Sequence, residues 1–144
     1  MLHHIRNFLW LDDHLGTSGL VRPEQLDTIA AEGFECVVNL LPDESDAWFP
    51  EEPERVEALG MEFVRIPVIW LRPTRENLDA FCAALDARRG KKLFVHCAAN
   101  MRVSAFVYLW RLRNGHDEAE AFDDLRDIWE PEGIWAEFIE ANRP

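Results

Sequence analysis

The sequence predicts a single α/β domain in which a central, mostly parallel sheet is flanked by helices. Apolar runs of strand length alternate with longer segments whose apolar residues recur at helical spacing. This alternation is typical of strand–helix–strand units, whose strands run parallel. The chain has 144 residues and contains no internal repeat, low-complexity segment or linker. We therefore expect one domain over residues 1–144.

Three or four strands, two helices and one loop are expected in the first half. They are one or two short strands within 7–20, a helix over 23–33, a strand over 34–41, an acidic loop over 42–50, a helix over 51–60 and a strand over 62–68. Pro23 suits the first turn of the first helix, and Gly33 suits its C-terminal cap. The run "FECVVNLL" is almost wholly apolar, which is typical of a strand buried on both faces.

The second half continues the same pattern. Thr74 can cap a helix over 75–89, whose apolar face carries Leu78, Phe81, Cys82 and Leu85. A buried strand, "KKLFVHC", follows. The next helix, "VSAFVYLWRLRNG", is apolar nearly all round, so we expect it to be central and covered on several sides. Two more helices, over 117–129 and 134–143, close the domain.

Composition narrows the classes of function. The chain has 27 acidic and 15 basic residues, and its net charge of −12 disfavours nucleic acid and anionic membranes as partners. No apolar run approaches the ~20 residues of a membrane span, and the N-terminus does not resemble a secretion signal, so we expect a cytoplasmic protein. The three cysteines include no CxxC pair, which argues against disulfides and structural zinc. We expect Cys36 and Cys82 to be small core residues.

Cys97 lies in "LFVHCAANMRVSAF", where a strand is expected to pass through a short loop into a helix. In parallel sheets, sites form at the carboxyl ends of strands, and three loops should meet there: those after Leu41, Val68 and Cys97. The start of a helix offers free backbone amides and a partial positive charge. Such a loop stabilises a thiolate, and Arg102 adds a planar fork that suits two phosphate oxygens. The loop therefore combines a nucleophile with an anion site.

The loop, together with "TSGLVRPEQLDTIAAEGFECVVNLLP" and "GMEFVRIPV" upstream, resembles the cysteine-dependent protein tyrosine phosphatase superfamily in its dual-specificity-like bacterial branch, over about residues 5–140. The resemblance implies that Cys97 attacks phosphorus and that water then hydrolyses the phosphoenzyme. It also implies that no metal or organic cofactor is needed and that His96 orients the loop. The residues it assigns to phosphate binding are Ala98, Ala99, Asn100, Met101, Arg102 and Val103.

The spacing departs from the family signature, which has five residues between cysteine and arginine and then Ser or Thr. Here four residues separate Cys97 from Arg102, and Val103 follows. We favour a loop that has lost one residue, because it keeps the arginine at the site. In the alternative alignment Ser104 keeps the hydroxyl position, and Arg102 has moved by one residue, or about 100° on a helix. Asn100 replaces the usual glycine and tolerates a left-handed backbone better than most residues.

The sequence also departs from the family pattern at the general acid, the residue that protonates the leaving group. The loop that usually carries it is "IWLRPT" here, which has no carboxylate. Proton donation to a leaving group is typically worth roughly 10²–10⁴-fold. Asp43 and Asp46 are substitute acids or solvated loop residues. Arg72 is a substrate ligand or a surface residue. Trp48 and Trp70 form an entrance or belong to the core, and Asn39 is a candidate to hydrogen-bond the loop backbone.

We expect a phosphatase-like hydrolase of phosphate monoesters that is slow for lack of an acid. Its substrate would be a phosphorylated protein or a small phosphate ester. Two alternatives stay open: a catalytically weak module that binds anions or phosphoproteins, and a rhodanese-like sulfurtransferase. The latter is suggested because "CAANMR" has the six-residue length of many rhodanese loops. The sequence leaves the substrate and the oligomeric state open.

Overall fold

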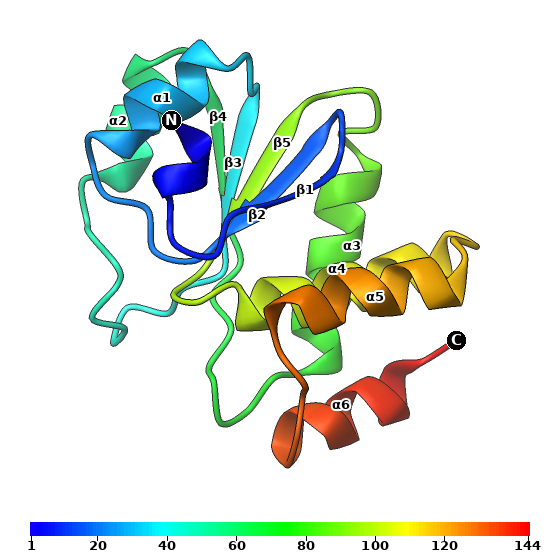
Figure 1. The fold of residues 1–144 in the computed structure, drawn as a ribbon. Helices are drawn as coiled ribbons and strands as arrows, with labels where there is room; N and C mark the ends of the chain where they lie inside the picture. The colour runs from blue at the N-terminus through cyan, green and yellow to red at the C-terminus, as the bar shows by residue number, and fades with distance from the viewer.

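The computed structural model describes all 144 residues, and its five strands form one sheet in the order β1-β2-β5-β3-β4. The strands are β1 (Leu9–Asp12), β2 (Leu15–Ser18), β3 (Cys36–Asn39), β4 (Glu62–Arg65) and β5 (Leu93–His96). The β1–β2 pair is antiparallel, and the other pairs are parallel. The predicted α/β fold with a mostly parallel sheet is confirmed (Figure 1).

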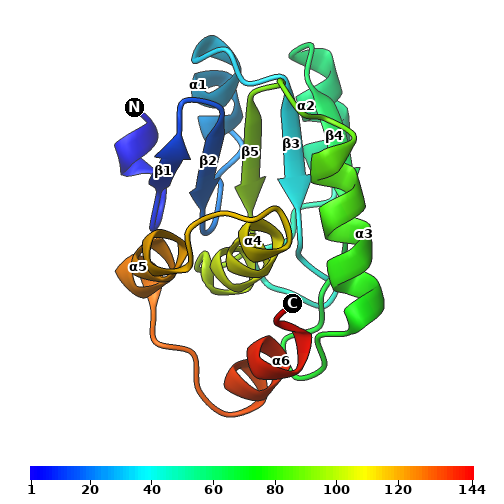
Figure 2. The same ribbon diagram turned by 90° about the vertical axis from the view of Figure 1, so that its right-hand side faces the viewer.

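Helices cover both faces of the sheet (Figure 2). The short 3-10 helix η1 (Leu2–His4), α1 (Gln25–Ala31) and α2 (Glu52–Ala58) lie on one face. The other face carries α3 (Arg75–Asp86), α4 (Met101–Arg113), α5 (Glu118–Ile128) and α6 (Ile134–Asn142). Successive strand residues point to opposite faces of the sheet. Val37 and Phe94 pack in the core beneath α1 and α2, whereas Val38 and Val95 pack in the core beneath α3 and α4. This explains why the central strands are apolar throughout.

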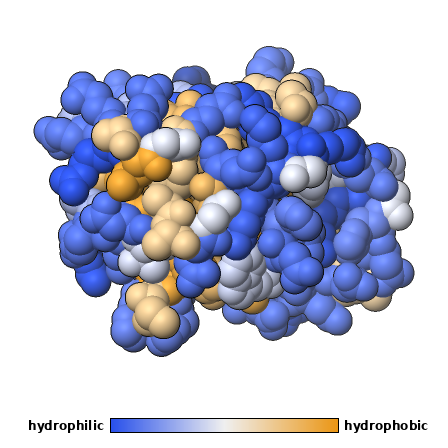
Figure 3. All heavy atoms as spheres, turned by 90° about the horizontal axis from the view of Figure 1, so that it is seen from above, coloured by the Kyte–Doolittle hydropathy of each residue, from blue (hydrophilic) through white to orange (hydrophobic).

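The helix α4 is the centre of the second layer. Its side chains from Arg102 to Leu109 are all buried, as the apolar sequence predicted. Thr74 caps α3 through a reciprocal capping box with Asn77, which confirms the expected start of that helix. No helix of the structure is both long and apolar enough to cross a bilayer. Figure 3 shows that hydrophilic residues dominate the molecule seen from above, with hydrophobic atoms gathered in one region on its left.

The β4 strand is shorter than predicted. It ends at Arg65 rather than at Val68, since Pro67 has no amide to donate to a neighbouring strand. The backbone nevertheless stays beside the strand β3, because Ile66 N–H donates to the Asn39 carbonyl and Val68 N–H donates to the Leu40 carbonyl, both at 2.9 Å. The following loop is therefore delivered to the carboxyl edge of the sheet.

The register brings the strand ends together at this edge. His96, the last residue of β5, lies between Ser18 of β2 and Asn39 of β3, and Asn39 pairs in turn with Arg65 of β4. All four strands therefore finish at one level. The residue after His96 is Cys97, which consequently emerges in the middle of the edge.

Candidate functional site

The loop between β5 and α4 is short and has one left-handed residue. Asn100 immediately precedes α4, with φ of 65°, and is fully buried. Its side-chain amide donates to the Asn7 carbonyl at 2.9 Å and to the Thr17 hydroxyl at 3.0 Å. These bonds explain why an asparagine replaces glycine here: its side chain stabilises the left-handed turn that the backbone requires.

The back of the loop is fastened to the N-terminal segment. Leu20 N–H donates to the Ala98 carbonyl at 2.9 Å, and the Asn7 side chain donates to the Ala99 carbonyl at 3.0 Å. Gly19 forms an isolated β-bridge with Ala99. A Cβ atom on Gly19 would lie 2.7 Å from the Ala98 carbonyl oxygen, so only glycine fits without moving the loop.

The backbone amides that follow Cys97 in the loop have no hydrogen-bond partners within the chain. No backbone amide over 98–103 donates a hydrogen bond within the chain. This is the condition expected at the first turn of a helix, where amides have no helical partner. The predicted phosphate-binding residues Ala98, Ala99, Asn100, Met101 and Val103 therefore supply unpaired backbone donors, although their role in binding stays a prediction.

Cys97 lines a pocket of about 170 Å³ at this loop. The cysteine is 1% exposed. The lining residues are Trp70, Cys97, Ala98, Ala99, Met101 and Arg102. Arg102 is thus the one charged side chain in the lining, and a pocket of this size suits a compact anion.

Arg102 is turned inward. Its side chain is 8% exposed, and its Nη1 donates to the Val68 carbonyl at 3.1 Å. The guanidinium carbon lies 5.6 Å from the centre of the Trp70 ring. Its Nε is buried without a hydrogen-bond partner, so the guanidinium has one unsatisfied donor. The position of Arg102 in the pocket wall agrees with the shortened-loop alignment, in which the arginine stays at the site.

Ser104 lies in a different environment. Its hydroxyl donates to the Met101 carbonyl at 3.0 Å and accepts from the Trp129 indole N–H at 3.0 Å. It does not line the pocket. Ser104 links the start of α4 to Trp129, the residue after α5, and its supporting role at the site stays a prediction.

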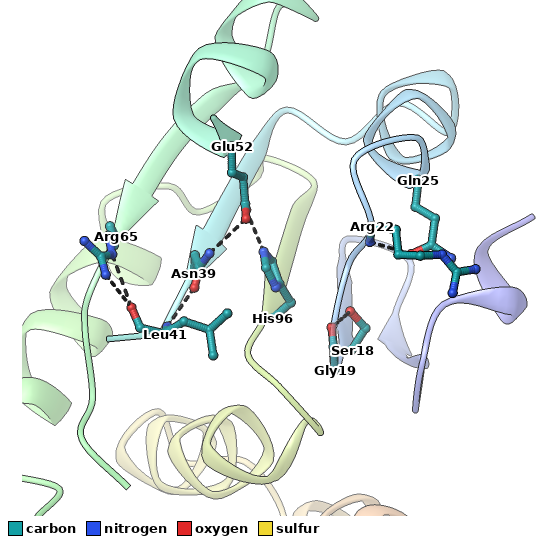
Figure 4. A network of polar contacts seen from close by, with 9 residues as sticks. All are labelled: Ser18, Gly19, Arg22, Gln25, Asn39, Leu41, Glu52, Arg65 and His96. Carbon is teal, nitrogen blue, oxygen red and sulfur yellow. Dashed lines mark hydrogen bonds and ion pairs between the residues drawn. The ribbon is translucent and has the colours of Figure 1, made fainter. Parts of the chain in front are cut away.

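A polar network lies at the ends of β3 and β5 and includes His96, the residue before Cys97 (Figure 4). His96 Nε2 lies 2.7 Å from Glu52 Oε2, and Asn39 Nδ2 donates to Glu52 Oε1 at 3.0 Å. Each of these three side chains is at most 1% exposed. The predicted Asn39 does not reach the loop backbone through its side chain. Its Oδ1 instead accepts from the Leu41 amide at 2.7 Å.

Glu52 was not among the predicted site residues. It opens α2 within an acidic stretch, and its neighbours Glu51 and Glu54 are exposed. One signal in the sequence was available: Glu52 stands four residues before the buried Val56, so both lie on the same face of the helix. A carboxylate on the apolar face of a helix needs a buried partner, and that partner is His96.

The candidate acids lie away from the pocket. Asp43 and Asp46 are exposed, and neither lines it. Asp43 forms an ion pair with Arg65 at 2.5 Å, while Arg65 also donates to the Leu41 carbonyl. The pocket lining contains no carboxylate at all. The acid role of the two aspartates therefore stays a prediction that would require this loop to move.

The loop after β4 contributes an aromatic wall instead of an acid. Trp70 lines the pocket and packs against Trp129 and Trp135, with ring centres 5.6 and 5.3 Å away. The Trp135 indole N–H donates to the Trp70 carbonyl at 2.9 Å, which fixes the loop to α6. Trp48 instead packs on Arg65, and Arg72 is exposed on the same loop as Trp70.

The structure contains no group of three or more His, Cys, Asp or Glu side chains that could hold a metal ion. The other two cysteines are buried in the core, as predicted. Burial chiefly raises the pKa of the Cys36 thiol to about 11 and also raises the pKa of the Cys82 thiol. Cys97 is therefore the cysteine that the fold presents to a pocket.

Comparisons of the chain with a family model and with solved structures identify related proteins. A family model described as a dual-specificity-type protein tyrosine phosphatase fused to NAD⁺ kinase matches residues 15–133. A candidate phosphatase from Shewanella putrefaciens is 34% identical, with a TM-score of 0.87 over 97% of this chain and 93% of that chain. No curated protein matches the chain.

Two less similar structures share the fold. Tk-PTP in its active form is 22% identical, with a TM-score of 0.79, over 94% of this chain and 95% of that one. The catalytic core of the PP-IP phosphatase SIW14 from S. cerevisiae, solved with citrate, is 16% identical, with a TM-score of 0.78, over 94% and 85%. The chain therefore belongs to the dual-specificity-like protein tyrosine phosphatases, a cysteine-dependent superfamily.

Proposed function

We propose that the protein hydrolyses phosphate monoesters through a phosphocysteine intermediate. The observation that carries this proposal is the shared pocket: Cys97 and Arg102 line one small cavity at the first turn of α4, beside the free amides over 98–103. A thiolate, a guanidinium and several amides pointing at one volume form a nucleophile with an anion cradle.

The reaction proceeds in two displacements. The Cys97 thiolate attacks phosphorus, an S–P bond forms, and the P–O bond to the leaving group breaks with its electron pair on that oxygen. Water then attacks phosphorus, the S–P bond breaks, and the products are inorganic phosphate and the regenerated thiolate. Arg102 and the loop amides hold the equatorial oxygens in both steps, because charge accumulates on them.

The substrate would be a phosphorylated protein or a small phosphate ester. Since the pocket lining has no carboxylate, the leaving oxygen receives no proton from the wall. Esters with good leaving groups, such as aryl phosphates, should therefore react faster than alkyl phosphates by about the 10²–10⁴-fold that a general acid supplies. If Asp43 or Asp46 moves in to act as the acid, Asp43→Asn or Asp46→Asn will slow alkyl substrates more than aryl ones.

The decisive experiment is hydrolysis of p-nitrophenyl phosphate by the wild type and by Cys97→Ser. We expect nitrophenol release from the wild type and its loss in the variant, with a phosphocysteine trapped by rapid acid quench and detected by mass spectrometry. Equal inactivity of the two proteins would refute turnover.

The acid-free lining favours a second candidate function, an anion- or phosphoprotein-binding module. In that case vanadate or phosphate raises the melting temperature of an inert wild type, and Arg102→Ala loses the shift. Production of thiocyanate from thiosulfate and cyanide would instead indicate the rhodanese-like reaction.

A further inference from the structure

Glu52 is a buried carboxylate that the proposed reaction does not use directly. It is fully buried at the start of α2, and each of its oxygens has one partner. Oε1 accepts from Asn39 Nδ2 at 3.0 Å, and Oε2 lies 2.7 Å from His96 Nε2. Figure 4 shows the Glu52 side chain extending from α2 towards Asn39 at the end of β3 and His96 at the end of β5.

The partners of Glu52 define its electrostatic state. A carboxylate removed from water needs a compensating charge, and without one its burial costs several kcal/mol. Asn39 is neutral, so His96 is the one bonded side chain that can carry a positive charge. Beside an ionised Glu52, the ring nitrogen 2.7 Å from its oxygen carries a proton and donates it. This contact fixes the position of the ring, and a proton on its second nitrogen would make the ring an imidazolium.

The other charged groups at this edge bond elsewhere than to Glu52 and His96, and Arg102 donates to the Val68 carbonyl. Arg65 of β4 donates to the Leu41 carbonyl and pairs with Asp43. The remaining acidic side chains of α2, Glu54 and Glu57, are exposed. His96 Nδ1 is buried without a partner. Glu52 is consequently the side chain that fixes the ring, and Cys97 is the next titratable group along the chain.

The network also joins the backbone under the loop. Asn39 and His96 are register partners on adjacent strands, and the His96 carbonyl accepts from Leu40 N–H at 3.0 Å. Glu52 bonds to both side chains and so ties α2 to the two strand ends. The ring is therefore held at the strand end from which the loop begins.

We propose that Glu52 is a positioning residue for the reaction, which holds His96 in place and in its charged form at the residue before Cys97 and so supports the thiolate. The inference rests on the proposed function for its catalytic meaning. A purely structural role for Glu52 would change stability alone, whereas a role exerted through His96 changes the reactivity of Cys97 in a pH-dependent way.

The test compares four proteins: wild type, Glu52→Gln, His96→Asn and the double variant. Glu54→Gln is the matched control, because it removes the same charge from an exposed position of the same helix. The first readout is the rate at which iodoacetamide alkylates Cys97 between pH 5.5 and 9.5. The raised pKa values of the Cys36 and Cys82 thiols keep them out of this measurement near neutral pH. The second readout is kcat/KM for p-nitrophenyl phosphate.

We expect Glu52→Gln to slow alkylation at pH 6 by roughly tenfold, the effect of losing a nearby favourable charge, and to change it little at pH 9.5. The value of kcat/KM at pH 6 should fall by a similar factor. In the His96→Asn background, Glu52→Gln should have no further effect on either readout, because the two residues act as one unit. Glu54→Gln should match the wild type.

Faster alkylation of Glu52→Gln at pH 6 would overturn the proposal, since it would reveal an uncompensated negative charge at Glu52. Additive effects in the double variant would overturn it too. An inert wild type would refute the proposed function, while the alkylation profile would still decide the role of Glu52. If Glu52→Gln fails to fold, long-range ¹H–¹⁵N NMR of the wild type decides instead: protons on both ring nitrogens of His96 are expected, and a ring with one bare nitrogen contradicts the charged form.

Discussion

Two buried cysteines lie at opposite ends of neighbouring strands. Cys36 begins β3 at the amino edge of the sheet, and Cys97 follows β5 at the carboxyl edge. Their exposed fractions are 0% and 1%, and each has an arginine in its surroundings: Arg88 for Cys36 and Arg102 for Cys97. Neither burial nor a neighbouring arginine therefore separates the candidate nucleophile Cys97 from Cys36.

The difference lies in what the two arginines are bound to. Arg88 donates to both oxygens of Glu62, at 2.9 and 2.6 Å, so its charge is already neutralised. Burial, followed by the charge of Glu62, accordingly raises the pKa of Cys36 to about 11. Arg102 instead meets a carbonyl and an indole ring, beside a run of free amides. A cysteine becomes a candidate nucleophile where the donors around it lack an anion of their own.

The largest expected effect contrasts the two arginines. Arg102→Ala should lower kcat/KM for p-nitrophenyl phosphate by roughly 10²–10³-fold, the typical cost of one group that stabilises transition-state charge. Arg88→Ala, measured in the same assay, should stay within about twofold, because Arg88 serves Glu62 at the other edge. Equal losses in the two variants would break the comparison.

Alkylation separates the two cysteines directly. A thiol whose pKa is raised stays protonated and unreactive as long as the pH is below that pKa. At pH 7.5 the shift of Cys36 from 9.0 to about 11 should lower its thiolate fraction by about a hundredfold. Peptide mapping after a short iodoacetamide pulse should therefore find the label on Cys97. Label spread evenly over Cys36 and Cys97 would contradict the assignment.

A smaller effect on kcat/KM is expected where Gly19 packs against the β5–α4 loop. Gly19→Ala should lower kcat/KM about tenfold, since the new Cβ displaces the Ala98 carbonyl and misplaces the anion cradle. Gly60→Ala is the control: Gly60 has φ of 86° with nothing within 4 Å of its Cβ position, so it should cost about 1 kcal/mol in stability. Its turnover should remain that of the wild type. Unchanged turnover of Gly19→Ala would show that the loop tolerates the shift.

The smallest expected effect is alkaline destabilisation at Cys36. Its folded pKa is raised above its ordinary value of 9.0, so its contribution to stability is complete below pH 9 and is lost as the pH rises towards 11. The melting temperature of Cys36→Val should therefore fall less between pH 8.5 and 10.5 than that of the wild type, by a few degrees. Parallel curves would show that Cys36 does not titrate with unfolding.

The fold followed from the sequence because its signals are local. Apolar strands, the Thr74 cap and the all-round apolar α4 each depend on residues close in the chain. Asn100 could also be anticipated, since few residues other than glycine accept its backbone conformation.

The site was less predictable where it depends on residues far apart. Glu52 meets His96 across 44 positions, and Asp43 is held by Arg65 across 22, through contacts that only the packed sheet creates. An acidic residue on a helix gives little sign of burial when it stands among exposed ones. The inward position of Arg102 likewise depends on where the loop after β4 places the Val68 carbonyl.

The tryptophan cluster gives the site an optical property. Trp70 faces the Arg102 guanidinium at 5.6 Å and has Trp129 and Trp135 as near neighbours. Indole emission responds to nearby charge, and rings this close exchange excitation energy. An anion bound in the pocket would change the charge next to Trp70, so we expect the intrinsic fluorescence of the protein to report occupancy without an added label.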